Sequence, residues 1–93
     1  MMSLASTFDV AKEIRATTKE ICALLLAKNK AYGDSALNPI RVFSRVDALE
    51  QIRVRIDDKL SRLARGTASG EDVILDLIGY LVLLRIGMKR GLK

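Results

Sequence analysis

The chain has 93 residues, enough for one domain, and its 49% hydrophobic share with only 4% aromatic residues favours helices rich in Leu, Ile and Ala. It has no histidine and a single cysteine, Cys22, which excludes Ser-His-Asp and Cys-His catalysis, histidine-ligated metal sites and an internal disulfide. The net charge of +5 favours an anionic partner, but the charges are interspersed and lack interleaved aromatic residues, which argues against nucleic acid. We therefore expect residues 1–93 to form one all-α domain in a reduced, cytoplasmic compartment.

The first predicted helix starts at a cap on Ser6 or Thr7, runs to about Ala31 and stops near Gly33. Residues 32–45 are predicted to form a connection that packs down on the domain rather than a further continuous helix. One face of the first helix is apolar at helical spacing, through Val10, Ile14, Thr17, Ile21, Leu24 and Leu25.

The second predicted helix starts at a cap on Ser44, with Asp47 in its first turn, and ends at Gly66. It has the clearest amphipathic pattern in the chain, because apolar residues recur every three or four positions. The apolar stripe consists of Leu49, Ile52, Ile56, Leu60 and Leu63, and a charged stripe consists of Arg55, Asp58, Lys59 and Arg62.

The third predicted helix starts at a cap on Ser69 and frays at Gly87 and Gly91. The turn before it is short, which predicts an antiparallel hairpin of the second and third helices. Its residues 73–84 are apolar nearly all round, so we expect the helix to be central or to lie at an interface in a homo-oligomer that completes the core. The apolar run is too short to span a bilayer, so no membrane association is expected.

Asp76 is the one carboxylate within this apolar run, and it needs a cation, a donor or a metal ion to offset its desolvation. The stretch 55–62 offers such partners, either for a structural ion pair or for a polar binding site. Asp72, Asp76 and Tyr80 are spaced four residues apart and share a face. With Asp57 or Asp58, the two aspartates could hold a divalent cation, whereas Asp72 could also be a helix-start charge only.

A second cluster of polar residues lies at the predicted end of the first helix. It combines cations, an amide, an aromatic ring and a hydroxyl, a set that can hold phosphate, ribose and base together. A helix stop followed by a turn would explain the same composition. Its members are Lys28, Asn29, Tyr32, Asp34 and Ser35.

Three ordered blocks of residues, over roughly 24–86, resemble the small all-helical nucleotide-modification-associated domains common in phage genomes. Those domains are distantly similar to the MazG-type all-α nucleotide pyrophosphohydrolases. The resemblance implies a nucleotide ligand, a helical oligomer and a phage origin, hence a location in the host cytoplasm. The blocks are Lys28-Asn29-x-x-Tyr32-Gly33-Asp34-Ser35, Arg55-x-x-Asp58-Lys59-x-x-Arg62 and Glu71-Asp72-x-x-x-Asp76-Leu77-x-x-Tyr80.

The resemblance also implies ligand contacts for Lys28, Asn29, Tyr32, Asp34 and Ser35, with the second block facing Asp72 and Asp76. MazG-type enzymes resemble one another in an ExxE pair on one helix and an ExxD pair on the next. Neither pair is complete here, because the position three residues after Glu50 is Arg53 and the position three residues after Asp72 is Leu75. Since phosphoryl chemistry relies on metal ions, this departure counts more strongly against a hydrolytic function than against nucleotide binding.

Three hypotheses follow. In the first, the protein sequesters a nucleotide without turnover and without a cofactor, as phage anti-defence sponges do with cyclic or other immune signalling nucleotides. In the second, it is a Mg²⁺-dependent nucleotide pyrophosphohydrolase with Asp58, Asp72 and Asp76 among its metal ligands. In the third, it is a helical interaction module in which Asp76 is merely paired.

Overall fold

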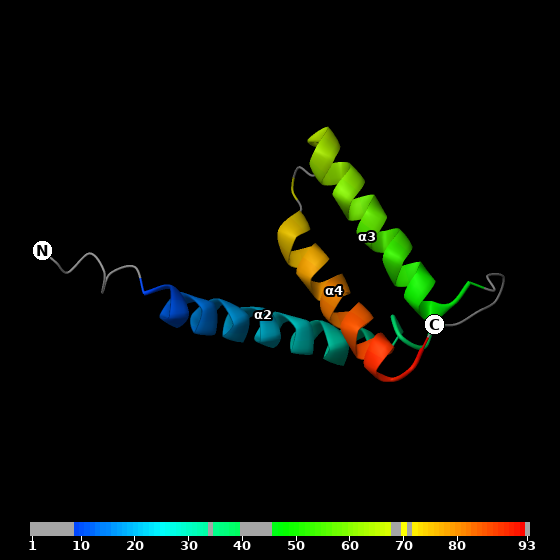
Figure 1. Ribbon diagram of the computed structural model, residues 1–93, viewed down its shortest axis with the longest axis horizontal. Helices are drawn as coiled ribbons and strands as arrows, with labels where there is room; N and C mark the ends of the chain where they lie inside the picture. The colour runs from blue at the N-terminus through cyan, green and yellow to red at the C-terminus, as the bar shows by residue number, and fades with distance from the viewer. Residues whose placement is uncertain (1–8, 34, 40–45, 68–69, 71, 93) are drawn as a thin grey trace, which may run out of the picture. The chain divides into compact units, whose positions relative to one another are not determined.

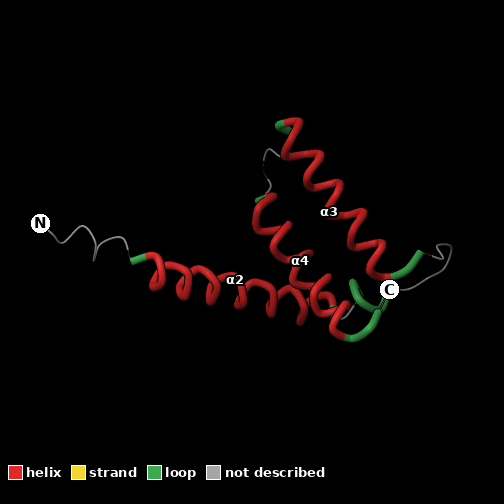
Figure 2. The backbone as a smooth tube through the Cα atoms, viewed as in Figure 1, coloured by secondary structure: helices red, strands yellow, loops and turns green. Residues whose placement is uncertain are grey.

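The computed structural model describes residues 9–33, 35–39, 46–67, 70 and 72–92 (Figure 1). In these ranges it contains three helices and no strand: α2 (Val10–Tyr32), α3 (Ala48–Arg65) and α4 (Val73–Lys89) (Figure 2). The all-α prediction is therefore confirmed. The chain forms two compact units, Met1–Gly33 and Asp34–Lys93, and each is described by itself. The expectation of a single domain over residues 1–93 stays a prediction.

The first unit consists of α2, which is capped at both ends by short polar contacts. The Asp9 side chain accepts a hydrogen bond from the Lys12 N–H at 3.2 Å, so Asp9 is the N-cap, whereas the predicted caps Ser6 and Thr7 lie outside the described residues. At the other end Gly33 has a φ of 68°, which favours glycine, and donates its N–H to the Asn29 carbonyl at 2.7 Å. The predicted stop near Gly33 is confirmed.

Helix α3 ends at Gly66, as predicted, but it begins directly after Asp47, later than the predicted cap on Ser44 implies. Asp47 stands at the N-cap position rather than inside the first turn, and Ser44 lies outside the described residues. Gly66 adopts the left-handed conformation with a φ of 69°, and the Thr67 N–H reaches back to the Arg62 carbonyl at 3.0 Å. This Schellman motif satisfies the last carbonyls of the helix.

Helix α4 starts and ends differently from the prediction. Its N-cap is Asp72, whose side chain accepts the Leu75 N–H at 3.0 Å, while Ser69 lies outside the described residues. Its C-terminus closes with Gly91 at a φ of 76° and a hydrogen bond from the Leu92 N–H to the Gly87 carbonyl at 3.0 Å. Gly91 therefore terminates the helix in an ordered motif and does not fray it.

The second unit is built on the predicted antiparallel hairpin, in which α3 and α4 lie side by side (Figure 1). The apolar stripe of α3 explains this packing, because it needs an apolar surface to cover it. Toward the end of α3, however, Leu60 and Leu63 of that stripe remain half exposed in one copy of the chain. The core consists of Leu37, Leu49 and Ile52, with Ile56, Tyr80, Leu83, Leu84 and Ile86 packed against it.

Gly87 is a buried part of this core, which corrects the expectation that it frays α4. A Cβ atom at this position would overlap Leu49 Cδ2 and lie 3.3 Å from Leu37 Cδ2. Leu49 is itself only 1% exposed, so its side chain has little room to move aside. The lack of a side chain at Gly87 thus allows α4 to approach α3 closely.

Gly87→Ala is expected to destabilise the hairpin by up to about 2 kcal/mol, because overpacking costs about 1 to 3 kcal/mol and better helix propensity returns about 1 kcal/mol. Urea unfolding followed by circular dichroism measures the change. In a Leu49→Ala background the overlap disappears, so the same substitution should be neutral or stabilising. Stabilisation of the otherwise unaltered protein by Gly87→Ala would contradict the packing described here.

Candidate functional site

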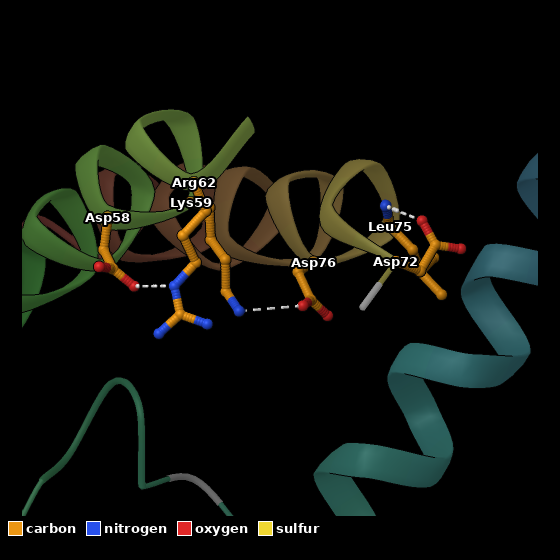
Figure 3. Close-up of polar contacts among 6 residues, drawn as sticks. All are labelled: Asp58, Lys59, Arg62, Asp72, Leu75 and Asp76. Carbon is orange, nitrogen blue, oxygen red and sulfur yellow. Dashed lines mark hydrogen bonds and ion pairs between the residues drawn. The ribbon is translucent and has the colours of Figure 1, made fainter. Parts of the chain in front are cut away.

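Asp76 finds its partner on the facing helix. The Lys59 Nζ of α3 lies 3.2 Å from the Asp76 Oδ2 of α4, and the two side chains are 16% and 26% exposed (Figure 3). The prediction that the stretch 55–62 supplies a partner for this carboxylate is therefore confirmed. Because a quarter of the Asp76 side chain remains accessible, the desolvation cost is smaller than full burial in the apolar run would impose.

A second ion pair lies next to the first. Arg62 Nε lies 3.2 Å from Asp58 Oδ2, one helical turn away on α3, and both side chains are more exposed than those of the first pair. Figure 3 shows the four residues in a row, with the two cations in the middle and one carboxylate at each end. We call Asp58, Lys59, Arg62 and Asp76 the charged seam.

Helical geometry explains why the charged seam forms beside the core. Lys59 and Arg62 are three residues apart on α3 and therefore project from neighbouring positions on one face. Lys59 directly precedes Leu60 of the apolar stripe, so its aliphatic stem can cover apolar surface while its ammonium group reaches the edge of the hairpin. From the other side, α4 brings only one carboxylate, Asp76, to this edge.

Other residues predicted for the site have structural roles in the second unit. Tyr80 packs against the core cluster, so its ring contributes to the hairpin's stability. Asp72 caps α4, which agrees with the alternative that it is a helix-start charge. Arg55 is exposed on α3, one turn before Lys59.

The three carboxylates predicted as Mg²⁺ ligands each make another contact. Within the described ranges, no three carboxylate or cysteine side chains lie close enough together to hold a metal ion. Each of the three predicted ligands has another role: Asp72 caps a helix, Asp58 holds Arg62 and Asp76 holds Lys59. The three carboxylates are thus engaged at different points of the hairpin, and their role as metal ligands in the hydrolase alternative stays a prediction.

The polar residues at the end of α2 belong mainly to the first unit. Lys28, Asn29 and Tyr32 lie in the last two turns of α2, and the Tyr32 ring is highly exposed. The Asn29 side-chain amide donates to the Gly33 carbonyl at 3.0 Å and so supports the helix end. Ser35 is exposed in the second unit, and Asp34 lies outside the described residues. The structure does not place this cluster relative to the charged seam.

The sequence pattern did not single out Arg85 and Lys89, which lie together on α4. They line a shallow groove with Ile78, Leu81, Val82 and Ile86. The signal was present as two basic residues four positions apart in a helix whose one other charged residue is Asp76.

No protein-family model, no curated protein and no solved structure matches this chain. None of the helices described here has the length and apolar character needed to cross a bilayer.

The two ion pairs of the charged seam should differ in strength. A double-mutant cycle with Lys59→Met and Asp76→Leu is expected to give a coupling of about 1 kcal/mol, because this pair is partly shielded from water. The matched cycle with Arg62→Met and Asp58→Leu is expected to give at most about 0.5 kcal/mol, since this pair is a solvated pair within one helix. Urea unfolding at low and high salt measures both couplings. Equal couplings that do not fall with salt would contradict the assignment of Lys59–Asp76 as the partly shielded pair and of Arg62–Asp58 as the solvated pair.

Proposed function

We propose that the charged seam binds the phosphate groups of a nucleotide or another phosphorylated small molecule, and that the protein captures this ligand without hydrolysing it. The observation that carries the proposal is the adjacent position of Lys59 and Arg62, each held by its own carboxylate at 3.2 Å. Two cations fixed side by side at a partly exposed edge match the charge and size of a phosphate group.

Existing ion pairs do not prevent phosphate binding. A guanidinium group has five N–H donors and an ammonium group has three, so each can hold a carboxylate oxygen and a phosphate oxygen at once. Arg62 meets Asp58 through Nε, which leaves the donors of its two terminal nitrogens outside this ion pair (Figure 3). The carboxylates hold both cations in place, which lowers the entropy cost of binding.

Capture is favoured over hydrolysis by the chemistry of the available groups. The chain has no histidine to act as a general base, and the carboxylates that a Mg²⁺ site would need are engaged elsewhere. Phosphoryl transfer depends on metal ions to neutralise developing charge, whereas binding does not. The incomplete carboxylate motifs of the sequence support the same conclusion.

The resemblance to phage nucleotide-modification-associated domains supports the choice of a nucleotide. The exposed Tyr32 ring of the first unit is an aromatic surface on which a base can stack. The biological role would be sequestration of a cyclic or other immune signalling nucleotide in the cytoplasm of an infected host.

Incubation with a bacterial nucleotide extract tests the proposal. After gel filtration, mass spectrometry of the denatured protein fraction should recover a nucleotide with its phosphate linkages intact. A parallel incubation with Mg²⁺ should give the same ligand and no phosphate or pyrophosphate release. Product release that requires Mg²⁺ would favour a pyrophosphohydrolase, and recovery of no phosphorylated compound would contradict the proposal as a whole.

A further inference from the structure

The face of α4 that lies opposite the core is an uncovered apolar surface. Leu81 is 51% exposed, and Ile74 and Met88 on the same face are exposed to a similar degree. The shallow groove of α4 runs along this face from Ile78 to Lys89. Contiguous apolar surface of this kind usually marks an interaction site.

Helix α2 carries a complementary uncovered stripe. Val10, Ile14, Thr17, Ile21 and Leu24 recur at alternating spacings of four and three, the repeat typical of helices that pack on other helices. None of the residues of α2 is buried, and Ile14 is 57% exposed. Since helical stability in proteins comes mostly from packing of an apolar face, this stripe needs a cover.

The charges beside the two surfaces select which surfaces pair. Glu13 and Glu20 directly precede Ile14 and Ile21, so they border the α2 stripe on one side, whereas the groove of α4 contains Arg85 and Lys89. Packing α4 on α4 would bring basic residues together, and packing α2 on α2 would bring Glu residues together. Packing α2 on α4 brings opposite charges together.

We infer that α2 of one copy docks in the α4 groove of a second copy, and that the protein forms a two-fold homodimer by this exchange. The stripe is long enough to fill the groove, because Val10 to Leu24 is fifteen residues and Ile78 to Lys89 is twelve, or about 22 Å and about 18 Å of helix. A two-fold axis lets each copy give its α2 and receive its partner's α2, so both uncovered surfaces of both copies are buried at once.

Charge reversal tests this exchange. One variant carries Glu13→Lys and Glu20→Lys, and a second carries Arg85→Glu and Lys89→Glu. Each alone should dissociate at least about tenfold more readily than the unaltered dimer, because like charges then face each other in both contacts. A control variant with Lys12→Glu and Lys19→Glu, which changes the opposite side of α2, should stay dimeric. Light scattering after size-exclusion chromatography gives the masses, and circular dichroism checks that each variant is helical.

Mixing the two charge-reversed variants gives the decisive result. Only in the exchanged dimer does a mixed pair regain opposite charges in both contacts, so a one-to-one heterodimer should form from two poorly associating proteins. A monomeric unaltered protein, or a mixture that stays dissociated, would overturn the inference and favour docking of α2 on its own chain. A dimer that survives Glu13→Lys with Glu20→Lys would equally overturn it, since packing of α4 on α4 does not involve those residues.

Discussion

Leu49→Ala is expected to destabilise the α3–α4 hairpin by about 2 to 5 kcal/mol, as large-to-small substitutions in packed cores do. Leu49 is almost fully buried, and it fills the space that Gly87 leaves open on α4. A domain of this size has a total stability of only about 5 to 14 kcal/mol, so the loss is a large share of it. Urea unfolding monitored by circular dichroism measures the effect.

Val54→Ala is the matched control for this prediction. Val54 also lies on α3, but its side chain is exposed. Removing its branched methyl groups should change the stability by less than about 0.5 kcal/mol. A similar loss at Val54 and Leu49 would mean that the two faces of α3 are not distinguished as the structure describes.

The second large effect is expected in ligand binding. Lys59→Met and Arg62→Met should each weaken the affinity for the nucleotide recovered from the extract by about tenfold or more, because a hydrogen bond to a charged group contributes about 1.5 to 3 kcal/mol. The double variant should lose nearly all affinity. Isothermal titration calorimetry at constant salt measures these affinities.

Two further variants separate ligand binding from charge and from folding. Arg53→Met removes one positive charge from α3 at the 3.9 Å pair with Glu50, away from the charged seam, and should change the affinity by less than about twofold. Asp76→Asn keeps both cations and removes the negative charge beside Lys59, while its amide oxygen can still accept a hydrogen bond that holds the ammonium group in place, so the affinity should be retained or increased. A loss of affinity in Asp76→Asn, with the fold intact, would contradict the role given to the two cations.

The helices were predictable because their apolar periodicity is strong, but their N-terminal caps were not. Asp9, Asp47 and Asp72 occupy the N-cap positions, each about three residues after the Ser or Thr predicted for that role. Serine, threonine and aspartate cap helices about equally well, so residue type alone does not rank neighbouring candidates.

The partner of Asp76 was predictable as a region and not as a residue. The apolar run required a cation, and the charged stripe of α3 offered Arg55, Lys59 and Arg62. The register of α4 against α3 selects Lys59, and that register depends on packing at Gly87 and Leu49. A glycine that looked like a helix breaker in the sequence is therefore what positions the hairpin.

The contacts of the carboxylates predicted as Mg²⁺ ligands were not predictable for a related reason. Spacing along a helix shows which carboxylates share a face, but it does not show which backbone or side-chain group each one meets first. Asp72 meets the backbone N–H of Leu75, and Asp58 meets Arg62. Local capping and ion pairing therefore engage both carboxylates.

The most direct test of phosphate binding at the charged seam is a nuclear magnetic resonance titration that follows the Arg62 Nε and Lys59 Nζ signals as the recovered nucleotide is added. We expect both signals to shift and saturate at one ligand per site, with smaller changes at Arg53 on the same helix. Signals of Lys59 and Arg62 that stay unchanged while the nucleotide binds would contradict the proposal.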